Sequence, residues 1–233
     1  MKRILLIAVW GWLGLGFCRI SLLQVAQAQL LPGILAKMEV AQRNLKSLRA
    51  TLEQQSVNVQ LGTKDTDYGT LIYTSADKGR LRIDYTKPSP QVLSIIGDEF
   101  LFYQPRLNQA LKTTFAKALK GRAGGQVQLI GLNKSVKTLA QNYQIEILND
   151  ESIEGAMTSH LRLTPKERGQ FAALEIWVSQ QSWLPLQHKV IAQNGDYSIV
   201  KLTKVELNLK LRNEDFIVKL PGNTVVVDRM EDE

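Results

Sequence analysis

The 233-residue sequence contains a single cysteine, Cys18, and only two histidines, His160 and His188. Because Cys18 lies near the N-terminus, the rest of the chain cannot form an intramolecular disulfide or bind a metal through thiolates. Neither histidine has a ligand-type neighbour at the spacing of a metal site. The sequence therefore predicts no metal and no cofactor, and both histidines are interpreted as structural residues.

Motifs of catalysis and of nucleic-acid binding are also missing. There is no Gly-x-Ser-x-Gly nucleophile elbow, and the glycine cluster Gly121–Gly125 lacks the Gly-Lys-Ser/Thr of a phosphate-binding loop. Residue counts alone leave a Ser-His-Asp triad open, but no motif favours one. Three of the positive charges behind the formal net charge of +7 lie in the first 19 residues, so little remains to attract a polyanion. We predict a protein that is not an enzyme and has no nucleic-acid partner.

Long apolar runs are absent apart from one near the N-terminus. Lys2 and Arg3 precede an apolar stretch from Ile4 to Phe17, which is shorter than the roughly 20 residues of a membrane-spanning helix. Ala26-Gln27-Ala28 then provides the small-x-small pattern of a signal-peptidase site. These features predict an exported protein with a signal peptide at 1–28, cleaved after Ala28, and one domain at 29–233 in the periplasm.

Cys18 offers an alternative interpretation of the N-terminus. A lipoprotein signal peptide is cleaved immediately before a cysteine that becomes acylated. The residue before Cys18 is Phe17, which is bulky, whereas a small residue is required there. Cleavage after Ala28 is therefore favoured.

The mature region begins with a helical pattern and continues with strand patterns. Apolar residues recur every three or four positions from Pro32 to Leu48, which predicts an amphipathic helix entered at Pro32. Most of the following chain alternates with period two, and Asn194-Gly195 is a strong hairpin signal. The expected strands include Gln91–Ile96 and, near the end of the sequence, Phe216–Leu220 and Thr224–Val227. About eleven short strands without intervening helices predict one strongly curved antiparallel sheet, because a flat sheet of that size is unusual.

The segment Thr114–Gln141 interrupts the strands. It predicts two short helices, near Thr114–Lys120 and Ser135–Gln141, joined by the flexible link Gly121–Gly125. We interpret this segment as a mobile helical lid over the sheet. Its predicted apolar contacts are Leu119, Leu129, Ile130, Leu132 and Leu139.

Apolar side chains alternate along the predicted strands, so one face of the curved sheet must be covered. A core made of the protein's own side chains and a cavity for an apolar ligand both satisfy this requirement. The residues expected on the cavity face are Leu71, Tyr73, Leu81, Ile83, Tyr85, Leu101 and Tyr103.

Several short motifs lie along the predicted strands. The basic-aromatic strand Lys78–Tyr85 precedes Pro88, a turn at Gly97-Asp98 and an aromatic strand that ends in Tyr103-Gln104-Pro105. These motifs resemble the LolA family of lipoprotein carriers. The closing segment, with Pro221-Gly222 between apolar runs, also resembles the family. The turn Ala76–Gly79 lacks the arginine and proline of the best-known members, so no lid-latching arginine is assigned.

The resemblance implies an open half-barrel with an apolar cavity that shields acyl chains. The implied function is a monomeric periplasmic chaperone that carries acylated lipoproteins toward the outer membrane. The implied partners are lipoproteins or lipids, an inner-membrane lipoprotein-releasing transporter and an outer-membrane acceptor. A carrier of another lipid, or a sensor of envelope stress with the same fold, is the alternative.

Overall fold

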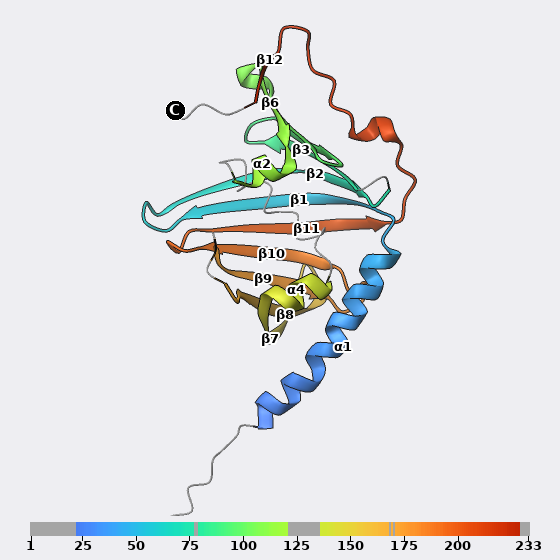
Figure 1. Ribbon diagram of the computed structural model, residues 1–233, viewed down its shortest axis with the longest axis vertical. Helices are drawn as coiled ribbons and strands as arrows, with labels where there is room; N and C mark the ends of the chain where they lie inside the picture. Colours follow the sequence, from blue (N-terminus) through green and yellow to red (C-terminus); the bar gives the residue numbers. More distant parts are fainter. Residues whose placement is uncertain (1–21, 77–78, 121–135, 168, 170, 229–233) are drawn as a thin grey trace, which may run out of the picture.

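The computed structural model describes residues 22–76, 79–120, 136–167, 169 and 171–228. Its main feature is one twelve-stranded sheet in the order β12-β6-β5-β4-β3-β2-β1-β11-β10-β9-β8-β7 (Figure 1). The first strands are β1 (Ser47–Asn58), β2 (Thr63–Thr74), β3 (Arg80–Lys87), β4 (Gln91–Ile96), β5 (Glu99–Gln104) and β6 (Gln109–Thr114). The others are β7 (Tyr143–Ile153), β8 (Ala156–Pro165), β9 (Phe171–Ser179), β10 (Pro185–Ala192), β11 (Tyr197–Leu207) and β12 (Val225–Val227).

The sheet is open, with β12 and β7 at its two ends. Neighbouring strands follow one another in the sequence except at β12 and at the centre, where β1 pairs with β11 and Leu52 lies opposite Leu202. This central pair unites the two halves of the sequence in one sheet. All pairs are antiparallel except β12 with β6. The predicted mainly β, open half-barrel architecture is confirmed.

Two strand predictions were incomplete or wrong. The sequence Gln109–Thr114 is too polar for a clear alternating pattern, yet it forms β6 between β5 and β12. Phe216–Leu220 was expected to be a strand, but Phe216 ends the 3-10 helix η3 (Asn213–Phe216) and the next residues form no ladder. Phe216 is buried by packing instead, which explains an apolar pattern without a strand.

Helix α1 (Leu22–Asn44) begins earlier than the sequence predicts. Pro32 lies inside it and not at its entrance, so the expected start was wrong. The residues before Pro32 are mainly leucine, alanine and glutamine, which are good helix formers. They extend the helix toward the N-terminus although Pro32 has no N–H to donate a helical hydrogen bond. Helix α1 packs against β7, the strand at one end of the sheet (Figure 1). No helix in the described chain is long and apolar enough to cross a membrane.

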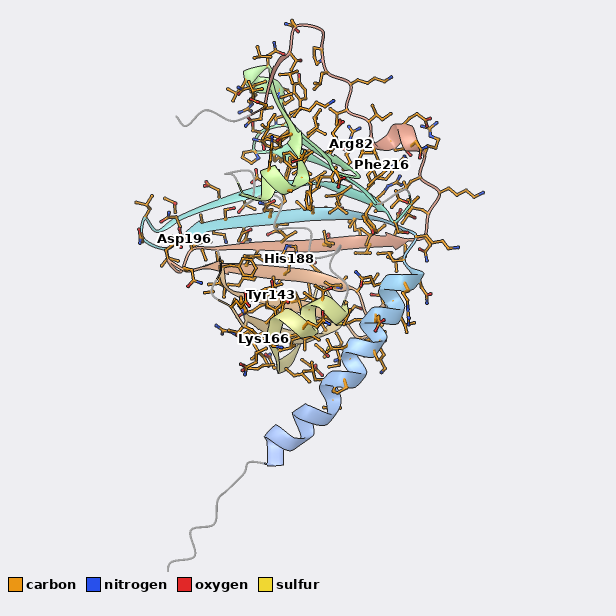
Figure 2. The ribbon with its side chains drawn as sticks, in the orientation of Figure 1. Arg82, Tyr143, Lys166, His188, Asp196 and Phe216 are labelled. Atoms are coloured by element: carbon orange, nitrogen blue, oxygen red, sulfur yellow. The ribbon has the colours of Figure 1, made fainter. Side chains whose placement is uncertain are left out.

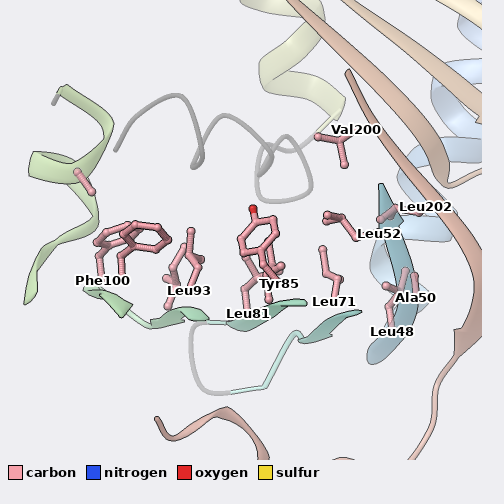
Figure 3. Close-up of a cluster of buried hydrophobic side chains, with 14 of the residues drawn as sticks. Leu48, Ala50, Leu52, Leu71, Leu81, Tyr85, Leu93, Phe100, Val200 and Leu202 are labelled. Carbon is pink, nitrogen blue, oxygen red and sulfur yellow. The ribbon is translucent and has the colours of Figure 1, made fainter. Parts of the chain in front are cut away.

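The inner face of the sheet carries two separate apolar clusters. One covers β1–β6 and β11 and includes Leu52, Leu81 and Phe100, whose side chains rise from the strands toward the same side (Figure 3). The other joins Met38 of α1 to β7–β9 and to the short helix α4 (Val136–Asn142). The short helix α2 (Phe115–Lys120) adds to the first cluster. The two clusters divide the inner face into two filled regions.

The outer face of β3–β5 is crossed by the C-terminal segment. Ser94 donates a hydrogen bond from Oγ to the carbonyl oxygen of Phe216 at 2.8 Å, and Arg82 donates to the carbonyl oxygen of Ile217 at 3.0 Å. Arg82 also forms an ion pair with Asp84 at 2.8 Å. Phe216 is almost fully buried. This segment, residues 208–224, is called the strap below.

Gly69 lies where β2 and β3 approach closely. A Cβ at this position would lie 2.5 Å from the carbonyl oxygen of Asp84, which is backbone and cannot rotate away. We expect Gly69→Ala to lower the free energy of unfolding by about 1–3 kcal/mol, as other overpacking substitutions do. Urea denaturation would measure this loss. Gly195→Ala is unsuitable as a control because its φ is positive, whereas Gly33→Ala meets no atom within 4 Å and should be neutral or stabilising.

Candidate functional site: an apolar pocket on the inner face

A pocket lies on the inner face where the two clusters meet. About 980 Å³ of space lies between its side chains, and part of this space is open solvent at the mouth. Residues of both clusters form its wall: Met38, Gln42, Leu45, Leu71, Tyr73, Val136, Leu139, Leu174, Ile176, Trp183, Leu184, Pro185, Leu186, His188, Val200 and Leu202. The pocket is therefore the unfilled boundary between two packed regions.

The wall is built by strand alternation and by two helices. Val200 and Leu202 are two residues apart in β11, so both face inward, as do Leu174 and Ile176 in β9. Strand β10 lies between them and contributes His188. The C-terminal half of α1 and the helix α4 supply further side chains, including Met38. Sheet curvature and helix position together hold the pocket open.

No aspartate, glutamate, lysine or arginine is among the described residues of the wall. Its polar side chains are Gln42, Tyr73, Trp183 and His188. Desolvation lowers the pKa of His188 to about 4, so its imidazole is neutral at pH 7. Burial also raises the pKa of Tyr73, which keeps the phenol neutral. The described wall therefore carries no net charge, which suits an uncharged apolar ligand.

Trp183 is placed on the wall by a tight turn between β9 and β10. Its backbone is left-handed, with φ of 56°, and its N–H donates to the carbonyl oxygen of Ser179 at 2.8 Å. The ammonium group of Lys37 lies 4.2 Å from the centre of the Trp183 ring. This cation–π contact links α1 to the turn. It holds one side of the pocket wall together.

The structure separates the predicted cavity residues into three groups. Leu71 and Tyr73 line the pocket. Leu81 and Tyr85 also point to the inner face (Figure 3), but together with Ile83 they belong to the packed cluster. Ile83 is completely buried. These three positions are core residues in the structure, without accessible surface in the pocket.

Tyr85 illustrates how polar groups in that cluster are satisfied. Its hydroxyl donates to Oε1 of Gln54 at 2.9 Å, and both residues are buried. Burial raises the pKa of Tyr85 far above its ordinary value, and the nearby carboxylate of Asp67 adds to the effect. The phenol is therefore neutral at pH 7. This pair is part of the core.

Leu101 and Tyr103 lie on the other face of β5. The strand alternates, and Phe100 and Phe102 are the residues in the inner cluster. Leu101 is opposite Ser94, which contacts the strap. The sequence could not assign these faces because both are apolar, and the apolar outer face is explained by the strap that covers it.

Of the predicted lid contacts, only Leu139 has a described side chain. It is buried on α4 and lines the pocket. Leu119 belongs to α2, but its side chain is not among those that the structure describes. Leu129, Ile130 and Leu132, and the link Gly121–Gly125, are outside the described residues. The two predicted short helices are present as α2 and α4.

Sequence reasoning missed the part of the pocket formed by β9, β10 and β11. His188, labelled on β10 in Figure 2, was expected to be structural, yet it lines the pocket. The alternation of Leu186, His188 and Val190 places the histidine on the apolar face of its strand, and that pattern was the available signal. Trp183 had no such signal because it lies in a turn.

His160 lies in a different environment. Its ring stacks on Trp177 with centroids 4.0 Å apart, and Nδ1 lies 3.2 Å from Oε1 of Glu151. Trp177 donates to Glu151 at 2.8 Å, and this hydrogen bond lowers the pKa of Glu151. Within the described chain no group of three metal-ligating side chains occurs. The cluster joins β7, β8 and β9 on the outer face.

Comparison with known proteins connects this geometry to a family. The sequence profile described as "Outer membrane lipoprotein carrier protein LolA" matches residues 43–219, which include most of the sheet and most of the pocket wall. No curated protein is similar enough in sequence to match.

Solved structures with the same fold have low sequence identity. An uncharacterized conserved protein from Thermus thermophilus is 14% identical, with a TM-score of 0.56 over 85% of this chain and 99% of that one. MucB, a Pseudomonas aeruginosa protein, is also 14% identical, with a TM-score of 0.53 over 81% of this chain and 62% of that one. At this level of sequence identity, the similarity to these structures shows a shared fold and nothing about function. The profile match covers well over half of the sequence, and the chain therefore belongs to the LolA family.

Proposed function

We propose that this protein is an exported carrier that shields acyl chains of lipoproteins or lipids from water. The observation that carries the proposal is the uncharged apolar pocket between the two clusters of the inner face. Family membership and the open half-barrel support it. A catalytic role is not part of the proposal, because the pocket offers apolar contact and no nucleophile paired with a base.

The energetic need for a carrier follows from the chemistry of acyl chains. Each buried methylene contributes about 0.8 kcal/mol, so a lipid anchor with several chains does not leave a membrane for water unaided. A carrier lowers this cost by offering apolar surface to the acyl chains, and it must later release the chains. A pocket between two clusters suits this role, because it offers apolar surface for acyl chains while the rest of each cluster stays packed.

The proposed route is transfer through the periplasm. Removal of residues 1–28 would release the domain 29–233 after export, and the segment Thr114–Gln141 would act as the lid. An inner-membrane transporter would load the protein, and an outer-membrane acceptor would receive the cargo. The description of the family supports this direction of transfer.

Mass spectrometry of molecules that co-purify with the mature protein tests the proposal. We expect acylated lipoproteins or lipids in the wild type, and at least tenfold less with Leu174→Trp, because the indole fills the pocket. Ile199→Trp is the matched control, since Ile199 alternates with the pocket residue Val200 and faces outward.

Three results would contradict the proposal or refine it. A wild type that carries no acylated molecule after gentle isolation contradicts it. Equal loading of the wild type and Leu174→Trp shows that the acyl chains are held elsewhere. Lipids without lipoproteins favour the alternative, in which the same fold carries another lipid or senses it.

A further inference from the structure

His188 occupies an unusual position for a histidine. It lies on β10 with Ile176 of β9 and Val200 of β11 as its cross-strand neighbours, and all three line the pocket. No hydrogen bond joins its imidazole to another residue that the structure describes. The residue is only partly exposed. An aromatic ring with two polar atoms is therefore set into an apolar wall.

Such a group can receive a hydrogen bond from a ligand. Neither ring nitrogen is among the fully buried unpaired atoms of the described residues, so water reaches the ring in the empty pocket. A ligand that displaces this water must replace its hydrogen bond, because a polar atom that loses water without gaining a partner destabilises the complex. A neutral imidazole has one N–H donor and one acceptor nitrogen. The site thus offers a hydrogen bond to an uncharged ligand that reaches the middle of the wall.

The chemistry of the wall also limits the charge of that ligand. None of the described lining residues is a cation, so an ionised carboxylate would lose its hydration without gaining an ion pair. The ammonium group of Lys37 contacts the ring of the wall residue Trp183, but Lys37 itself does not line the pocket. An ester or amide carbonyl accepts a hydrogen bond and carries no charge.

We propose that His188 donates a hydrogen bond to the ester or amide carbonyl of a bound acyl chain, so that the pocket takes esterified or amide-linked chains in preference to free fatty-acid anions. This inference rests on the proposed function and specifies its ligand. It also explains why a polar side chain interrupts the apolar face of β10.

Displacement of the neutral fluorescent probe N-phenyl-1-naphthylamine from the mature protein tests the preference. The competitors are methyl octanoate, octanoate at pH 8, and 1-chlorooctane, which has no carbonyl. We expect methyl octanoate to displace the probe at a concentration at least tenfold lower than octanoate does. We expect it to be about fivefold more effective than 1-chlorooctane, the effect of one neutral hydrogen bond.

Three variants assign the effect to His188. His188→Leu should weaken methyl octanoate about fivefold and leave 1-chlorooctane unchanged or tighter. His188→Gln keeps a donor and should restore part of the difference between ester and chloride. Gln187→Leu is the matched control, because its side chain alternates to the other face of β10 and is not in the pocket wall; it should behave as the wild type.

The outcomes separate this inference from the proposed function. Equal displacement by octanoate and methyl octanoate overturns the preference for uncharged chains while leaving an acyl carrier. Equal weakening of ester and chloride by His188→Leu overturns the hydrogen bond, because it shows a packing effect alone. If neither the probe nor any neutral competitor binds the wild type, the proposed function fails and the inference fails with it.

Discussion

Replacing Ile83 by glutamate is expected to prevent stable folding, whereas replacing Leu186 by glutamate is expected to leave the protein folded and impair its pocket. Ile83 is completely buried in the first cluster, with Leu71 and Leu93 as its cross-strand neighbours. A carboxylate there must either remain charged without a partner or take up a proton. Both outcomes cost several kcal/mol, which is comparable to the whole stability of a domain.

Leu186 has a different environment although it also faces inward. It lines the pocket and is partly exposed, so a carboxylate at this position keeps contact with water. The expected loss of stability is within about 1–2 kcal/mol. Binding of N-phenyl-1-naphthylamine should fall at least tenfold, because the new charge must be desolvated when the probe enters.

Circular dichroism and probe fluorescence measure the two effects separately. Ile83→Glu should lack a cooperative thermal transition, and Leu186→Glu should show one near that of the wild type. Ile83→Val controls for the loss of a methyl group and should cost only about 0.5–1.5 kcal/mol. A folded Ile83→Glu that no longer binds the probe would show that Ile83 lines a cavity, as the sequence alone allows.

The architecture was largely predictable because strand alternation depends on local sequence. Gln91–Ile96 was predicted with the bounds that β4 has, and Asn194-Gly195 does connect β10 to β11. The failures have local causes as well. Pro32 indicates a helix start, but good helix formers before it extend α1. The polar strand β6 is stabilised by its neighbours on both sides.

The candidate site was predictable only in part. Alternation identified Leu71 and Tyr73 as inward-facing, and both line the pocket. It could not show which inward-facing residues are packed, so Ile83 and Tyr85 were assigned to the same cavity. That distinction depends on how two clusters meet in space. It also depends on β1 pairing with β11, a contact between residues about 150 positions apart in the sequence.

Acidification is expected to destabilise the protein through His188 between about pH 6.5 and pH 4. In the unfolded chain the imidazole has a pKa near 6.5. In the folded protein, desolvation lowers the pKa of His188 to about 4. Between these values the unfolded chain binds one proton more than the folded protein, so the free energy of unfolding falls as the pH falls.

The full effect is up to about 3 kcal/mol, since each pKa unit corresponds to about 1.4 kcal/mol. It is absent above about pH 7 and complete below about pH 4. His188 has some accessible surface toward the pocket, and water there reduces the effect. Paired carboxylates such as Glu151 lose their stabilising charge in acid too, but they do so equally in a variant that changes only His188.

The measurement is urea denaturation of the wild type and His188→Leu at pH 7, 6, 5 and 4.5. The difference in the free energy of unfolding between the two proteins should shift in favour of His188→Leu by about 1–3 kcal/mol as the pH falls. Because the chain has only one other histidine, an NMR titration can assign the imidazole signals with His188→Leu as the reference. Parallel stability curves, or an imidazole of His188 that titrates near pH 6.5, would show that water reaches the ring freely. In that case the wall around His188 would be wet, and an ester carbonyl would gain little by displacing water from it.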